Sequence, residues 1–201
     1  MLPFAHAGIT LGAAVLLNGL FGSHAEKTTQ QRNDCVSATG ARLQRVEAWV
    51  TSAGYRIDLR VLLTGSLLPD LDKLTGCLVF GTFGGRLFCH SLLFLLIIAA
   101  AGLCLCLIRR KNWLLVLGFG VLMHLVLDGM WFDLQTLLWP SLGFSFPTIE
   151  RTGWLQGVFH RLFTSPSIYM PEALGVVMLA CFAWLLVQRG KVRAFILHGR
   201  V

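Results

Sequence analysis

The chain has 201 residues, of which 55% are hydrophobic and 13% are charged, about half the charged share of a typical soluble domain. This composition excludes a disordered chain, a coiled coil and an ordinary soluble domain, and with a mean hydropathy of +0.69 it indicates an integral membrane protein. The formal charge of +7 fits either nucleic-acid binding or cytoplasmic anchoring of membrane loops, and the positions of the charges decide between them.

Five apolar segments are candidates for membrane-spanning helices, which need about 20 mainly apolar residues each. Four are almost free of charge, whereas one is interrupted by Pro69 and the charged residues that follow it. Pro171 and Gly190 supply a start and a stop for the last segment. The sequence therefore predicts a single all-α membrane domain over residues 1–201. Its spans are expected near residues 2–21, 61–83, 88–108, 113–131 and 173–188.

Two longer segments are predicted to lie outside the lipid. Segment 24–60 is polar, and segment 133–170 is rich in Trp, Phe and Pro, which suits a membrane interface. Thirteen of the seventeen Lys and Arg residues lie in segment 24–60, the cluster 109–111 and the C-terminal tail. The positive-inside rule places these three regions in the cytoplasm and the N-terminus outside. Anchoring explains the basic charge, so no nucleic acid is expected as a stable partner.

Ionisable residues inside the spans are the clearest functional signal, because they are costly in lipid and usually serve a function. The orientation set by Lys and Arg places six of them at one depth near the outer face. His124 and Asp128 share one helix face, and an imidazole beside a carboxylate can hold a divalent cation. Pro69 breaks its helix just before two carboxylates. The six residues are His6, Asp70, Asp72, His90, His124 and Asp128.

Three interpretations of this group are open: a metal site, a proton or ion pathway, and structural hydrogen bonding between helices. We favour the metal site, because carboxylates at one membrane depth need a neutralising cation. Arg86 and Ser91 flank His90 and are the candidate substrate-binding residues; Arg86 either binds an anionic group or extends to the lipid headgroups. His160 and Glu172 lie on the same outer side, and the sequence assigns them no role.

The order of the motifs resembles the LexA-regulated, membrane-bound metal-dependent hydrolase family of bacterial inner-membrane proteins. It also looks like that of the zinc-dependent phospholipase C and single-strand nuclease superfamily, of which this family would be a membrane-embedded relative. The resemblance covers residues 4–128. It rests on Phe4-Ala5-His6-Ala7-Gly8, on Gly65-Ser66-Leu67-Leu68-Pro69-Asp70-Leu71-Asp72-Lys73, on Arg86 with His90-Ser91, and on His124-x-x-x-Asp128.

The resemblance implies specific roles for these residues. Asp128 would bridge two ions, and Asp70 or Asp72 would orient the attacking water. The soluble enzymes bind metal through their N-terminal residue and a His-x-x-x-Glu pair, which have no match here, so one or two ions are expected. Zinc is preferred over Mn²⁺ or Mg²⁺. The implied metal ligands are His6, Asp70, His90, His124 and Asp128.

The expected function is metal-dependent hydrolysis of a phosphoester in a lipid or another amphipathic substrate, at the outer face of the bacterial inner membrane. The alternative is a divalent-cation or proton-coupled transporter that uses the same residues. A transport path needs polar residues in the inner halves of the spans, and few are present there. The sequence does not indicate an oligomeric state.

Overall fold

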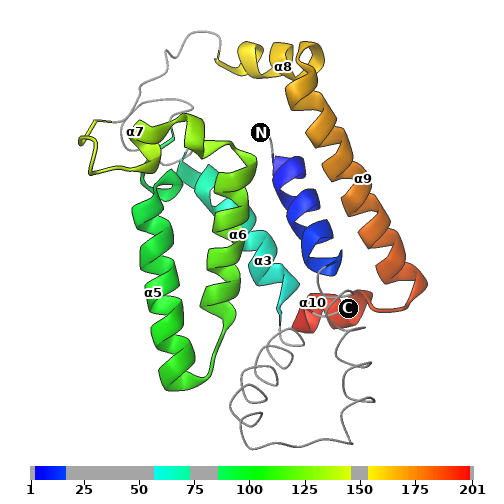
Figure 1. Cartoon of the computed structure of the whole chain (residues 1–201). Helices are drawn as coiled ribbons and strands as arrows, with labels where there is room; N and C mark the ends of the chain where they lie inside the picture. The colour runs from blue at the N-terminus through cyan, green and yellow to red at the C-terminus, as the bar shows by residue number, and fades with distance from the viewer. Residues whose placement is uncertain (1–2, 17–56, 73–85, 146–153, 200–201) are drawn as a thin grey trace, which may run out of the picture.

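The structure is a computed structural model that describes residues 3–16, 57–72, 86–145 and 154–199 (Figure 1). All regular elements in these ranges are helical, which confirms the all-α class. Three of them are single 3-10 turns: η1 (Leu68–Asp70), η2 (Phe88–His90) and η3 (Met130–Phe132). The α-helices are an N-terminal helix (Pro3–Leu16), α3 (Leu59–Leu67), α5 (Leu92–Arg109), α6 (Trp113–Leu127), α7 (Leu134–Leu137), α8 (Trp154–Thr164), α9 (Pro166–Gln188) and α10 (Val192–His198).

The longer helices run between two ends of the molecule, and a short helix lies across each end (Figure 1). The helix α8 crosses the upper end, where α7 and the N-terminus also lie, and α10 crosses the lower end. The N-terminal helix stands between α9 and the pair formed by α3 and α6. This arrangement brings the start of the N-terminal helix and the end of α6 to the same end of the molecule.

Two helices, α5 and α9, are long and apolar enough to cross a membrane, and the N-terminal helix and α6 are apolar but shorter. The number of spans and their orientation stay predictions. The predicted helix start at Pro171 is wrong: α9 begins at Pro166, with Ser165 as its N-cap, and Pro171 lies inside the helix. Proline fits the first turn of a helix, and Pro166 takes that position first. Much of segments 24–60 and 61–83 lies outside the described residues.

Helices α3 and α6 pack backbone against backbone. A Cβ at Gly120 would lie 2.5 Å from the carbonyl oxygen of Leu62 and 2.8 Å from the nitrogen of Ser66, and a Cβ at Gly65 would collide with the carbonyl of Leu117. Small residues permit this approach in membrane helices. The helix α3 then ends at Leu67 and continues as η1, as the predicted break at Pro69 requires. The contact therefore sets the end of α3 beside the end of α6.

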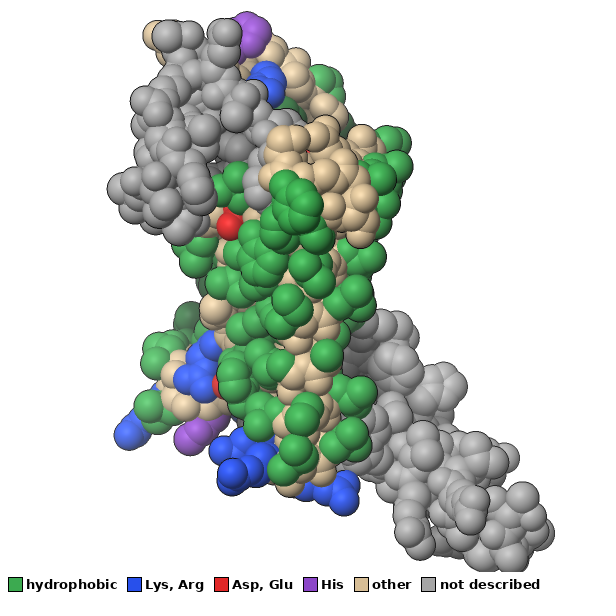
Figure 2. All heavy atoms as spheres, turned by 90° about the vertical axis from the view of Figure 1, so that its left-hand side faces the viewer, with side chains coloured by type: hydrophobic (Ala, Val, Ile, Leu, Met, Phe, Trp, Pro, Cys, Tyr) green, Lys and Arg blue, Asp and Glu red, His purple; other side chains and the backbone are tan. Residues whose placement is uncertain are grey.

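At the opposite end, the start of α3 is tied to α10. Arg60 binds the Asp58 carboxylate through Nη2 at 2.7 Å and donates through Nη1 to the carbonyl of Ile196, also at 2.7 Å. The hydrogen bonds from Arg60 hold the pKa of Asp58 below its usual value. Lys and Arg side chains gather at this lower end of the apolar surface (Figure 2). The basic end and the ligand-bearing end are thus opposite each other.

Candidate metal centre

Four separate elements bring the predicted metal ligands together at the upper end of the bundle. His6 lies in the second turn of the N-terminal helix, Asp70 ends η1, His90 ends η2, and His124 and Asp128 come from the end of α6. The three imidazoles are fully buried, and the Asp128 side chain is 1% exposed. Asp70 is the most exposed of the five, at 19%. The sequence prediction that these residues share one site agrees with this placement.

Asp128 is the centre of the cluster. Its Oδ1 lies 3.2 Å from Nε2 of His6, and its Oδ2 lies 3.9 Å from Nε2 of both His90 and His124. The ring of His6 stacks on that of His124, with 3.9 Å between centroids and 16° between planes. One carboxylate therefore faces three imidazoles, which is the arrangement that a bridging ligand requires.

Among the residues that the structure describes, two overlapping groups of three have ligand atoms within 4.8 Å of one another. The first is His6, His124 and Asp128, and the second is Asp70, His90 and His124, so His124 belongs to both. In the second group Nε2 of His124 lies 3.8 Å from Oδ1 of Asp70. Ligand atoms around a tetrahedral zinc ion lie about 3–4 Å apart, because each zinc–ligand bond is about 2 Å long. Small movements of these side chains would satisfy that geometry.

Hydrogen bonds outside the cluster fix the tautomers of two histidines. Nδ1 of His124 donates to the carbonyl of Ser66 at 2.7 Å, and Nδ1 of His90 donates to Oδ2 of Asp72 at 3.3 Å. With its proton on Nδ1, a neutral imidazole presents the lone pair of Nε2. Both Nε2 atoms are buried and make no hydrogen bond to any described residue. A ring that donates through one nitrogen and presents the lone pair of the other is typical of metal-binding histidines, and it fits a divalent cation.

The side chain of Asp72 contacts the segment that carries His90. Its Oδ2 accepts the backbone N–H of Cys89 at 2.7 Å as well as the Nδ1 proton of His90, and the residue is buried. A carboxylate used in this way orients His90, and a part for it in orienting the attacking water stays a prediction. Of the two candidates for that task, Asp70 is the one whose carboxylate reaches the cluster.

The predicted substrate-binding pair separates into two roles. Arg86 is one-third exposed, and its Nη2 lies 3.2 Å from Oδ2 of Asp128 while Nη1 lies 3.7 Å from Asp133. Arg86 thus pairs with the carboxylate at the centre of the cluster. Ser91 is fully buried, and its hydroxyl caps α5 by accepting from the N–H of Phe94 and donating to the carbonyl of Phe88. This cap occupies the hydroxyl of Ser91, and its assignment to the substrate stays a prediction.

The two residues without a predicted role lie in different surroundings. His160 is exposed on α8, and its described contact is with Thr164 of the same helix. Glu172 on α9 is buried and accepts the backbone N–H of Ala5 at 3.3 Å. This contact joins residues 167 positions apart, and no local pattern in the sequence indicates it.

An apolar, all-helical chain with a buried His/Asp cluster at one end defines a membrane protein with a candidate metal centre. The model of the YdjM inner membrane protein family matches residues 1–192, and the chain belongs to this family. The match locates the protein in the inner membrane. No curated protein and no solved structure matches the chain.

Proposed function

We propose that the protein is a membrane-embedded, metal-dependent hydrolase that cleaves a phosphoester in a lipid or another amphipathic substrate. The observation that carries the proposal is the convergence of three buried Nε2 atoms on the Asp128 carboxylate. Desolvating these groups without a cation is costly. A divalent cation would neutralise the carboxylates and accept the Nε2 lone pairs of the histidines.

The donor set of imidazole nitrogens and carboxylate oxygens favours zinc over Mn²⁺ or Mg²⁺. His6, His124 and Asp128 would hold one ion, and Asp70 and His90 would contribute to a second. His124 can bind only one of them, because its Nδ1 carries a proton and only Nε2 presents a lone pair. When bound, such an ion supplies Lewis-acid activation of water and stabilises charge on phosphoryl oxygens.

The chain's own polar groups divide the remaining work. Asp70 is partly exposed beside the cluster, so its carboxylate is placed to orient a water molecule that enters from outside. The Arg86 guanidinium is also partly exposed and points to the same centre. Its planar donors match a phosphoryl group, so Arg86 would bind the substrate after releasing part of its contact with Asp128.

The packing below the cluster favours a hydrolase over a cation or proton transporter. There α3 and α6 touch through Gly65 and Gly120 without room for side chains. Beside them the described residues form an apolar core on the side toward the basic end. Its buried residues are Leu11, Ala14, Leu59, Leu62 and Val116.

A lipid substrate follows from the position of the cluster. Helices α5 and α9 expose apolar surface along their length, and the cluster lies at the end opposite the basic residues. In a bilayer this position corresponds to the headgroup level of the outer leaflet. The phosphoester of a lipid would therefore meet the site without leaving the membrane.

The test is hydrolysis of a panel of phospholipids and lipid phosphates by the purified protein in detergent, with and without a chelator. Asp128→Asn keeps the size of the side chain but removes an anionic ligand, so we expect loss of bound zinc and of hydrolysis at every pH. Asp58→Asn, at the opposite end of the molecule, is the matched control and should retain both.

Two results would contradict the proposal. One is hydrolysis by the wild type that a chelator does not affect. The other is the absence of any turnover together with proton flux in liposomes that depends on Asp128 and resists the chelator, which would indicate a transporter.

A further inference from the structure

The three histidines of the cluster differ in how their rings are held. His90 and His124 are each anchored through Nδ1, to Asp72 and to the Ser66 carbonyl. Among the described residues, neither nitrogen of His6 makes a hydrogen bond of good geometry. Its ring stacks on His124 and faces Asp128. The position of this ligand must therefore come largely from the placement of its helix.

Helix α9 fixes that placement at two points. The first is Glu172, whose Oε2 accepts the N–H of Ala5, the residue before His6. The second is a crossing of glycines one turn further along: a Cβ at Gly8 would collide with Gly175, and a Cβ at Gly175 would collide with the backbone of Phe4. Two contacts one turn apart define both the height and the rotation of the N-terminal helix against α9.

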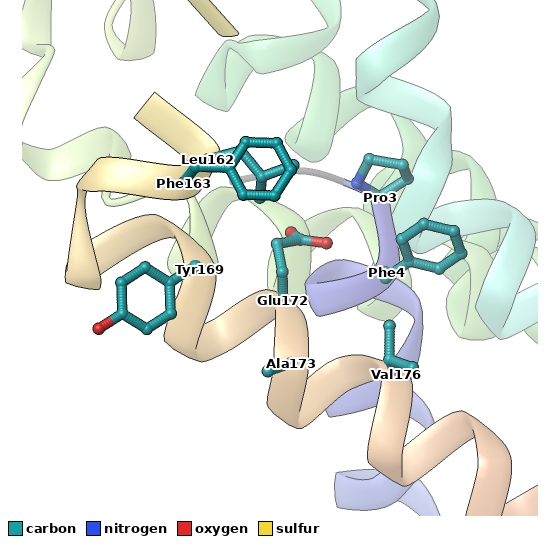
Figure 3. Close-up of a pocket in the computed structure, with 8 residues that line it drawn as sticks. All are labelled: Pro3, Phe4, Leu162, Phe163, Tyr169, Glu172, Ala173 and Val176. Carbon is teal, nitrogen blue, oxygen red and sulfur yellow. The ribbon is translucent and has the colours of Figure 1, made fainter. Parts of the chain in front are cut away.

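Glu172 lies in apolar surroundings, where burying a carboxylate is costly unless a polar partner stabilises it. The residue is 6% exposed and lies in the wall of an apolar groove of about 630 Å³ between the N-terminal helix, α8 and α9. Figure 3 shows its carboxylate extending from α9 toward the first turn of the N-terminal helix, beside Phe4. A carboxylate there is stabilised by the unpaired N–H groups and positive dipole of the helix start.

We propose that Glu172 is a positioning residue, which holds His6 in place by capping the helix that carries it. This inference rests on the metal centre of the proposed function. It separates Glu172 from the metal ligands: the carboxylate acts on the backbone of Ala5, and a neutral acceptor of the same length can replace it.

The experiment is a Co²⁺ titration of the purified full chain in detergent, followed by the visible ligand-field absorption. Glu172→Ala removes the cap and should weaken Co²⁺ binding about tenfold, with altered bands, as expected for a group that orients a ligand. Glu172→Gln keeps an oxygen acceptor and should retain the wild-type affinity and spectrum. Val176→Ala, one turn along α9 in the same groove, is the matched control and should behave as wild type.

Glu172→Asp provides a milder second variant, because it keeps the charge but withdraws the carboxylate by one methylene. It should weaken Co²⁺ binding as Glu172→Ala does. Equal losses in the Gln and Ala variants would overturn the inference by indicating a direct ligand, and wild-type Co²⁺ binding by Glu172→Ala or Glu172→Asp would overturn it as well. A wild-type chain that binds no Co²⁺ would overturn the metal centre of the proposed function, and the inference with it.

Discussion

At the scale of single residues, the site depends on the oxygen atoms that accept the Nδ1 protons of two histidines. The Ser66 carbonyl sets the tautomer of His124, and the Asp72 carboxylate sets that of His90. A backbone acceptor cannot be removed by substitution, whereas a side chain can. Substitution of Asp72 therefore tests directly whether an acceptor for Nδ1 supports metal binding.

Asp72→Ala should weaken zinc binding by about 10- to 100-fold, because His90 loses the acceptor that holds its proton on Nδ1. Metal content after dialysis against a graded chelator would measure the change. Asp72→Asn retains an oxygen acceptor and should lose less. Zinc binding that is identical in the wild type and the Ala variant would show that Asp72 does not support the centre.

The grouping of the candidate ligands could be predicted from the sequence, whereas the contacts that hold them could not. His124 and Asp128 are four residues apart on one helix, and this spacing alone places them on one face. The contacts of Asp72 with His90 and of Glu172 with Ala5 join separate elements. Such pairings depend on how helices pack, and this information is not present in local spacing.

At the scale of helices, the contact between α3 and α6 sets the distance between Asp70, which follows α3, and His124 and Asp128 at the end of α6. Gly120 lies against Leu62 and Ser66, and Ser66 is also the acceptor for His124. A methyl group at this position would force the backbones apart and move that carbonyl.

Gly120→Ala should therefore lower the stability of the folded protein by about 1–3 kcal/mol, the usual cost of overpacking. Thermal unfolding in detergent would measure it. Gly157 on α8 has open space around its Cβ position, so Gly157→Ala is the matched control and should be neutral or slightly stabilising. Equal stability of both variants would contradict the close-packed contact.

The helical class and the break at Pro69 could be predicted because apolar runs and proline act locally. The start of α9 could not, since Pro166 and Pro171 each fit a first turn and the choice depends on packing. Glu172 illustrates the consequence: in α9 it lies in the second turn and reaches Ala5, whereas a helix that began at Pro171 would have placed it in the first turn.

At the scale of the whole molecule, the end where Lys and Arg gather lies opposite the candidate metal centre. Arg60 contacts Ile196 of α10, and the cluster 109–111 follows the end of α5 that lies at the α10 end (Figure 1). The buried histidines are on elements that meet at the α8 end. The positive-inside rule predicts an orientation from this polarity. We expect the basic end to face the cytoplasm and the candidate metal centre to face the outer side of the inner membrane.

Single cysteines in a chain whose six native cysteines have been replaced would test this orientation. Asn112 lies in the turn between α5 and α6 at the basic end, and Ser141 is exposed just after α7 at the other. In intact spheroplasts a membrane-impermeant maleimide should label Ser141→Cys, and Asn112→Cys only after detergent is added. The reverse pattern would place the centre at the cytoplasmic face, where the substrate would have to come from the inner leaflet, although the distances within the cluster would be unchanged.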